Sequence, residues 1–184
     1  LYVFIHPMNH SIAWNRMNTD DLHRWLGREL SLMVAAIRMS CSGVFDRHPD
    51  LHVQFAHLAG GLGWYLPRLR THLEDKEFWG IQDSPEHGRR PEHDITWYME
   101  NRMMFDIAGW SGPTDTARRA VHWIKHGLMD IPPSRLVFAT DYPQAVRDDA
   151  AIRDYVAGVH ALGADGEAIL TGNAHRLIPG LAKA

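Results

Sequence analysis

The sequence predicts an α/β fold with parallel strands, and two observations support this prediction. Short apolar runs of strand length alternate with longer segments in which apolar residues recur at helical spacing. The apolar runs show no clean alternation of apolar and polar residues, which indicates strands covered on both faces or closed into a barrel, and hence parallel pairing. The runs are LYVFI (1–5), LHVQFA (51–56), RMMFDIA (102–108) and RLVFA (135–139).

Helical patterns lie between these runs and after the last one. Two of these helices have a candidate N-cap at the start and a glycine at the end. The first begins at Asp20 and ends at Gly43, and the second begins at Thr114 and ends at Gly127. The charged stretch 74–94, rich in Pro and Gly, is predicted to be a long insertion loop. Alternating strands and helices favour βαβ units. The predicted helices cover residues 20–44, 114–127, 148–161 (beginning at Asp148) and 172–178.

Composition limits the classes of function. The 184 residues suffice for one domain or for part of a larger one. A formal net charge of -3 gives no basic surplus for nucleic acid, and no apolar run approaches the roughly 20 residues that span a bilayer. The single cysteine, Cys41, fits a reducing compartment, so we expect a cytoplasmic protein without an intrachain disulfide. Because Leu1 already belongs to a predicted strand, we expect further chain upstream of it.

Three of the four predicted strands end in a side chain that can bind a metal or exchange a proton. His6 follows the first run, His57 follows the second, and Asp141 follows the fourth. In parallel α/β folds, reacting groups collect at the carboxyl ends of the strands. One such residue alone is more often a packing residue, but three at equivalent positions favour a divalent metal site, because imidazole and carboxylate are its natural ligands.

The sequence resembles the amidohydrolase-related family, through motifs that occur in order along nearly the whole chain. This family includes aminocarboxymuconate-semialdehyde decarboxylase, aromatic-acid decarboxylases and metal-dependent hydrolases. The resemblance implies a distorted (β/α)8 TIM barrel, of which residues 1–184 are a single partial domain, the C-terminal portion with strands five to eight. The motifs are FIHP, SGVFDRHPDLHVQFAHLAGG, MMFDIAG, LVFATDYPQ and TGNAHRLI.

The resemblance also implies roles for individual residues. His6 and Asp141 match metal ligands, and His57 and Asp141 match groups that handle protons near the metal. Arg68 lies at a spacing where some members bind the substrate carboxylate at a subunit interface, which implies a homodimer; the alternative is a solvated helix arginine. We expect zinc as the metal, with manganese as the second choice. Two features of the family are missing here: a first-strand His-x-His or Glu-x-His, and a glutamate shortly after the sixth-strand histidine, where this chain has Leu-Ala-Gly-Gly at 58–61.

The implied function is a metal-dependent decarboxylase or hydrolase that acts on a small carboxylated, cyclic or unsaturated substrate, and decarboxylation is favoured. The alternative is a non-catalytic half-barrel with a structural or dimer-forming role. Two further features have a less specific meaning. His122 and His126 share a helix face, but without a following glutamate a surface role is favoured over a metal site. Asp106, inside the third run, is either a substrate-facing group or a hydrogen-bonded structural carboxylate, and the second is favoured.

Overall fold

The computed structural model describes residues 1–8, 17, 19–73, 91–109, 113–178 and 180–181. Within these residues, four parallel strands form one sheet in the order β1-β2-β3-β4. Each strand lies inside the apolar run predicted for it, so the predicted parallel α/β fold is confirmed. The strands are β1 (Tyr2–Ile5), β2 (His52–Phe55), β3 (Met103–Asp106) and β4 (Leu136–Val137).

The last strand is shorter than predicted because its hydrogen bonds leave the sheet early. The Phe138 N–H donates to the Ile169 carbonyl at 2.9 Å, outside the sheet. One face of the sheet packs into the core, where the rings of Phe55 and Phe105 stack with their centroids 6.3 Å apart. The other face carries polar side chains such as Gln54, because successive residues of a strand point to opposite faces.

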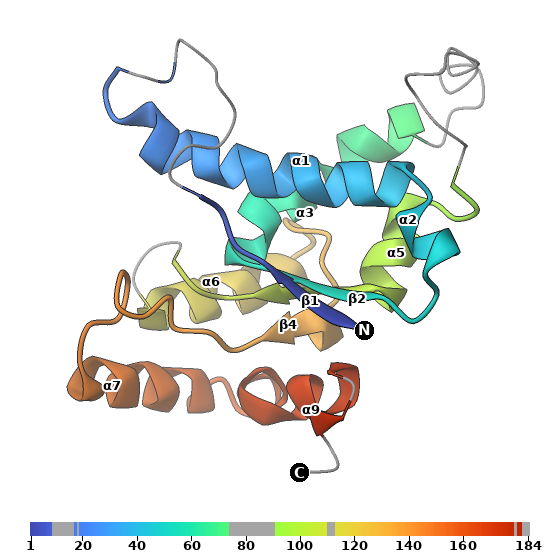
Figure 1. Ribbon diagram of the computed structural model, residues 1–184. Coiled ribbons are helices and arrows are strands. Elements are labelled where there is room, and N and C mark those ends of the chain that lie inside the picture. The colour runs from blue at the N-terminus through green and yellow to red at the C-terminus, as the bar shows by residue number, and fades with distance from the viewer. Residues whose placement is uncertain (9–16, 18, 74–90, 110–112, 179, 182–184) are drawn as a thin grey trace.

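The helices surround the sheet. Figure 1 shows α1 (Arg28–Cys41) and α3 (His57–Leu73) above the strands in this view, α6 (Pro113–Lys125) beside them, and α7 (Asp149–His160) and α9 (Asn173–Leu177) below them. None of the described helices has the length and apolar character needed to cross a membrane. The shorter elements are the π-helices η2 (His23–Gly27) and η5 (Ala168–Gly172), the 3-10 helix η4 (Pro133–Arg135), and α2 (Val44–Arg47), α5 (Ile95–Asn101) and α8 (Ala164–Glu167).

The predicted helix ends are confirmed in part. Asp148 caps α7 as expected, and its carboxylate accepts from the Ala151 N–H at 2.8 Å. The prediction of Asp20 as an N-cap is wrong, because Asp20 has a left-handed backbone (φ 57°) and the element η2 begins only at His23. Thr114 is also not an N-cap, since α6 begins one residue earlier, at a proline that suits the first helical position.

Two other predicted boundaries can be compared with the structure. Gly43 does separate α1 from the short α2, with a left-handed backbone at φ 67°. Most of the predicted insertion loop, residues 74–90, lies outside the described residues. The predicted loop ends at Asp94, which lies among the described residues. The Asp94 carboxylate caps α5 by accepting a hydrogen bond from the Trp97 N–H at 2.7 Å. The sequence pattern did not predict α5 itself.

Candidate metal centre and active site

The structure brings His6, His57 and Asp141 together at the carboxyl ends of the strands. One potential ligand atom from each lies within 4.8 Å of the others. His6 Nε2 is 3.4 Å from Asp141 Oδ1, and the two imidazole rings meet edge to face at 5.2 Å between centroids. The register explains the meeting of the two histidines, because Ile5 pairs with Phe55 and both strands end at the same level. Two imidazoles and a carboxylate fit a divalent metal with positions left open for substrate.

The His57 ring is buried (3% exposed) and held in one orientation. Its Nδ1 lies 3.0 Å from the Ala108 carbonyl oxygen. A carbonyl can only accept, so Nδ1 carries the hydrogen, and in the neutral ring the lone pair is on Nε2. Gly109 lies against the same ring with φ 79°, and a Cβ at this position would be 2.5 Å from Nδ1. The ring therefore occupies space that only a glycine leaves open.

The backbone that presents His57 is a left-handed turn. Residues 57–61 all have positive φ, between 51° and 83°, and the first three are not glycines. A left-handed backbone costs about 1–2 kcal/mol for each residue that carries a Cβ. Strain of this kind is found where a structure must place a functional side chain, and surrounding interactions have to stabilise it.

Asp106 provides that stabilisation. Its carboxylate is 1% exposed and accepts hydrogen bonds from the His57 N–H (2.9 Å), the Ala108 N–H (3.2 Å) and Gln54 Nε2 (3.0 Å). Burial raises the pKa of Asp106, and these hydrogen bonds oppose the rise. The Tyr2 hydroxyl in turn donates to Gln54 Oε1 at 2.5 Å, which extends the network across three strands. Asp106 is thus the hydrogen-bonded structural carboxylate that the sequence favoured.

Asp141 also has a left-handed backbone (φ 51°) and begins a turn. Its carbonyl oxygen accepts from the N–H groups of Gln144 (2.7 Å) and Ala145 (2.9 Å). Its side chain remains 14% exposed, compared with 41% for His6. The cluster therefore runs from the buried His57 through Asp141 to the more open His6.

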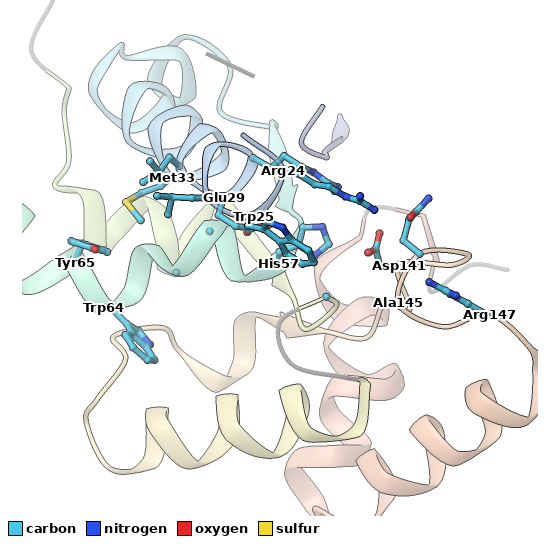
Figure 2. Close-up of a pocket in the computed structure, with 17 residues that line it drawn as sticks. Arg24, Trp25, Glu29, Met33, His57, Trp64, Tyr65, Asp141, Ala145 and Arg147 are labelled. Atoms are coloured by element: carbon cyan, nitrogen blue, oxygen red, sulfur yellow. The ribbon is translucent and has the colours of Figure 1, made fainter. Parts of the chain in front are cut away.

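Two cavities meet at His57 and Asp141. The larger, of about 600 Å³, lies between α1, α3 and the strand ends (Figure 2). The smaller, of about 430 Å³, lies on the polar face of the sheet and includes His6 and Asp106. Volumes in this range suit small-molecule ligands. Three arginines and three aromatic residues line the larger cavity: Arg24, Arg28, Arg147, Trp25, Trp64 and Tyr65.

Glu29 is a cavity residue that the sequence pattern did not reveal. It lies in the first turn of α1, and burial raises the pKa of its carboxyl, while the nearby His57 and Arg28 lower it. At Gly60 a Cβ would lie 1.9 Å from the Glu29 carbonyl oxygen. This close approach explains why no side chain, and hence no glutamate, stands at Gly60. Helical spacing predicted the helix but not which of its residues meets the strand ends.

The remaining predicted residues lie away from the cluster. Arg68 is exposed on α3 and lines neither of the two cavities, so its role at a subunit interface stays a prediction. The neighbouring Arg70 forms an ion pair with Asp130 at 3.1 Å. His122 on α6 and His126 directly after it are exposed with ring centroids 4.4 Å apart, and they belong to no group of three possible metal ligands among the described residues.

These features define a parallel α/β protein with a metal-competent cluster at its strand ends. Comparison with known proteins is more specific, and the chain belongs to the amidohydrolase family, which it matches over residues 3–180. It is 25% identical over 181 residues to gamma-resorcylate decarboxylase of Polaromonas sp. strain JS666, covering 95% of this chain and 49% of that protein. Gamma-resorcylate decarboxylase of Rhizobium radiobacter is 25% identical over 179 residues, with the same coverage of both chains.

Solved structures show the same likeness. The dihydroxybenzoic acid decarboxylase of Polaromonas sp. JS666, with bound manganese and the inhibitor 2-nitroresorcinol, is 25% identical with a TM-score of 0.64, and the match covers 95% of this chain and 48% of that one. The 5-carboxyvanillate decarboxylase of Sphingomonas paucimobilis has a TM-score of 0.67 at 20% identity, covering 96% and 49% of the two chains, and shares the fold. The chain thus spans about half the length of these relatives.

Proposed function

We propose that this chain is the C-terminal half, strands five to eight, of the (β/α)8 barrel of a metal-dependent aromatic-acid decarboxylase. Residues 1–184 would then form a single partial domain. The observation that carries the proposal is the cluster of His6, His57 and Asp141 at the strand ends, where two cavities meet. The family match and the decarboxylases among the relatives support the reaction class. These observations favour an enzyme over a non-catalytic half-barrel.

The donor set of the cluster fits a divalent metal. His6 and Asp141 would hold the ion, and His57 faces the same space. Such an ion binds the oxygens of a carboxylated substrate and stabilises negative charge that develops during the reaction. We propose manganese before zinc, which reverses the order expected from the sequence, because the solved Polaromonas decarboxylase contains manganese.

The chain itself supplies three things to the reaction. Arg28 and Arg147 place positive charge in the larger cavity, where it can attract a carboxylate. Trp25 gives the same cavity an aromatic surface for a ring. When the bond between the ring and the carboxylate breaks and carbon dioxide leaves, the electron pair stays on the ring carbon and must take up a proton. His57 and Asp141 border both cavities and are the groups proposed to deliver it.

Two further properties are proposals that rest on the resemblance and the composition. We propose a homodimer in which Arg68, exposed on α3, reaches the substrate carboxylate in the neighbouring subunit. We also propose a cytoplasmic location, based on the single cysteine.

The test is turnover of 2,6-dihydroxybenzoate by the manganese-loaded protein, with carbon dioxide and resorcinol both measured. We expect His6→Ala and Asp141→Asn to abolish turnover and stoichiometric metal binding. His122→Ala, an exposed histidine on α6, is the matched control and should change neither. Turnover without carbon dioxide would exclude a decarboxylase. Absence of bound metal in the wild type, with His6→Ala indistinguishable from it, would instead favour a non-catalytic half-barrel.

A further inference from the structure

Glu29 is an acidic group in the larger cavity to which the proposed reaction gives no task. Figure 2 shows it on α1, in the cavity that His57 and Asp141 also line. The backbone of Glu29 is fixed against the turn after β2, because its carbonyl oxygen lies where a Cβ of Gly60 would stand. Main-chain packing therefore fixes the backbone of this residue at the cavity that the proposed metal centre borders.

Within the part of the chain that the structure describes, no group donates a hydrogen bond to the Glu29 carboxyl. No hydrogen bond or ion pair joins it to another described residue, and its Oε2 is sealed from solvent. An unpaired buried acceptor is unfavourable, and this is most pronounced for an ionised carboxylate. The raised pKa of Glu29 has the same physical origin, because burial disfavours its charged form. A bound ligand that donates a hydrogen bond to Oε1, the carboxyl oxygen that is not sealed, would offset the cost of burying the carboxylate.

The charge of the cavity limits what kind of donor fits. Arg24, Arg28 and Arg147 line it together with the carboxyl groups of Glu29 and Asp141, so the balance of charge favours an anionic ligand over a cationic one. The donor must then be a neutral group carried by an anion. The Trp25 ring in the same wall favours an aromatic body. A hydroxyl on the ring of an aromatic carboxylate meets all three requirements.

We propose that Glu29 is a specificity residue that accepts a hydrogen bond from a ring hydroxyl of a carboxylated aromatic substrate. This inference rests on the proposed function only in placing the substrate in the larger cavity. It assigns a substrate feature, the hydroxyl that faces α1, to a residue outside the His6–His57–Asp141 cluster. A polar group positioned for a substrate hydroxyl discriminates against analogues that lack it.

The test compares two ligands, 2,6-dihydroxybenzoate and 2-hydroxybenzoate, by calorimetric binding to the manganese-loaded protein. The second ligand keeps one hydroxyl beside the carboxylate and lacks the other. In the wild type, losing that hydroxyl should weaken binding about 10- to 100-fold, as expected for one hydrogen bond to a charged group. In Glu29→Met, which removes both oxygens at similar side-chain length, the ratio should fall below about 3-fold. Glu29→Gln, which keeps a neutral acceptor, should lie between them.

Glu100→Met, on the exposed side of α5, is the matched control and should keep the wild-type ratio. Glu29→Met is expected to fold, because replacing an unpaired buried acceptor by an apolar group is neutral or stabilising. An equal hydroxyl dependence in the wild type and Glu29→Met would overturn the inference, and so would failure of the wild type to bind either ligand.

The outcome is separable from that of the proposed function, because binding is measured without turnover. A Glu29-dependent preference in a protein that releases no carbon dioxide would support this inference and contradict the decarboxylase. Carbon dioxide release with a preference that does not depend on Glu29 would do the reverse.

Discussion

Replacing Gly109 by alanine tests how the structure holds His57. A Cβ at Gly109 would lie 2.5 Å from His57 Nδ1 and 2.8 Å from Cε1. Carbon and nitrogen atoms without a bond between them normally stay about 3.5 Å or more apart, so the ring must move by roughly 1 Å. That movement would break the hydrogen bond from Nδ1 to the Ala108 carbonyl and turn Nε2 away from His6 and Asp141.

The expected cost has two parts, and a second glycine separates them. Gly127 has a similar backbone (φ 66°), but a Cβ there would have no described atom within 4 Å. Gly127→Ala therefore reports the backbone strain alone, about 1–2 kcal/mol. Gly109→Ala adds the overpacking against the ring, typically about 1–3 kcal/mol more. In Gly109→Ala the displaced His57 ring no longer faces His6 and Asp141, so manganese affinity should fall about 10- to 100-fold. In Gly127→Ala it should stay at the wild-type value.

Urea unfolding of the two variants measures the first difference, and calorimetric titration with manganese measures the second. Equal stability and equal metal affinity of Gly109→Ala and Gly127→Ala would show that the ring does not depend on this glycine. Loss of affinity with no extra loss of stability would still support displacement of the ring, but it would refute the overpacking energy given above.

Three further predictions concern Asp106, Glu29 and Cys41. Asp106→Ala leaves three buried donors without their acceptor and should lower the free energy of unfolding by about 3–6 kcal/mol. Asp106→Asn keeps one carboxyl oxygen and should lose less than half of that free energy. Equal losses for the two variants in urea unfolding would contradict this. Burial raises the pKa of Glu29 above its ordinary 4.5, against the opposing effect of His57, so the folded state binds this proton more tightly than the unfolded chain. Wild-type stability from Glu29 is therefore present at low pH and lost as pH rises through the folded pKa. The stability of Glu29→Gln relative to the wild type should increase as the pH rises above the ordinary pKa of 4.5, and parallel unfolding midpoints would refute the shift. Burial also raises the pKa of Cys41 to about 11, so alkylation at pH 8 should be about 100-fold slower in the folded protein than in urea, and comparable rates would contradict its burial.

Positions along single strands could be predicted from the sequence, because one physical rule governs them. Parallel neighbours end at the same edge, so residues that follow adjacent apolar runs must meet, as His6 and His57 do. Local capping was predicted less well: the same reasoning succeeded at Asp148 and failed at Asp20, whose backbone is left-handed. No local pattern encodes which helix residue reaches the strand ends, so Glu29 was missed.

The third strand explains what the sequence pattern could not show. The sequence places no metal-binding side chain directly after the third apolar run, so β3 was the one predicted strand without a candidate site residue at its end. In the structure β3 and the residues after it hold His57 in place. The Asp106 carboxylate and the Ala108 carbonyl accept its hydrogen bonds, and Gly109 has no side chain that would contact its ring. A larger side chain after β3 would occupy the space of the His57 ring. The absence of a large side chain after β3 is therefore a condition for the orientation of His57 after the neighbouring β2, and all four strands contribute to the site.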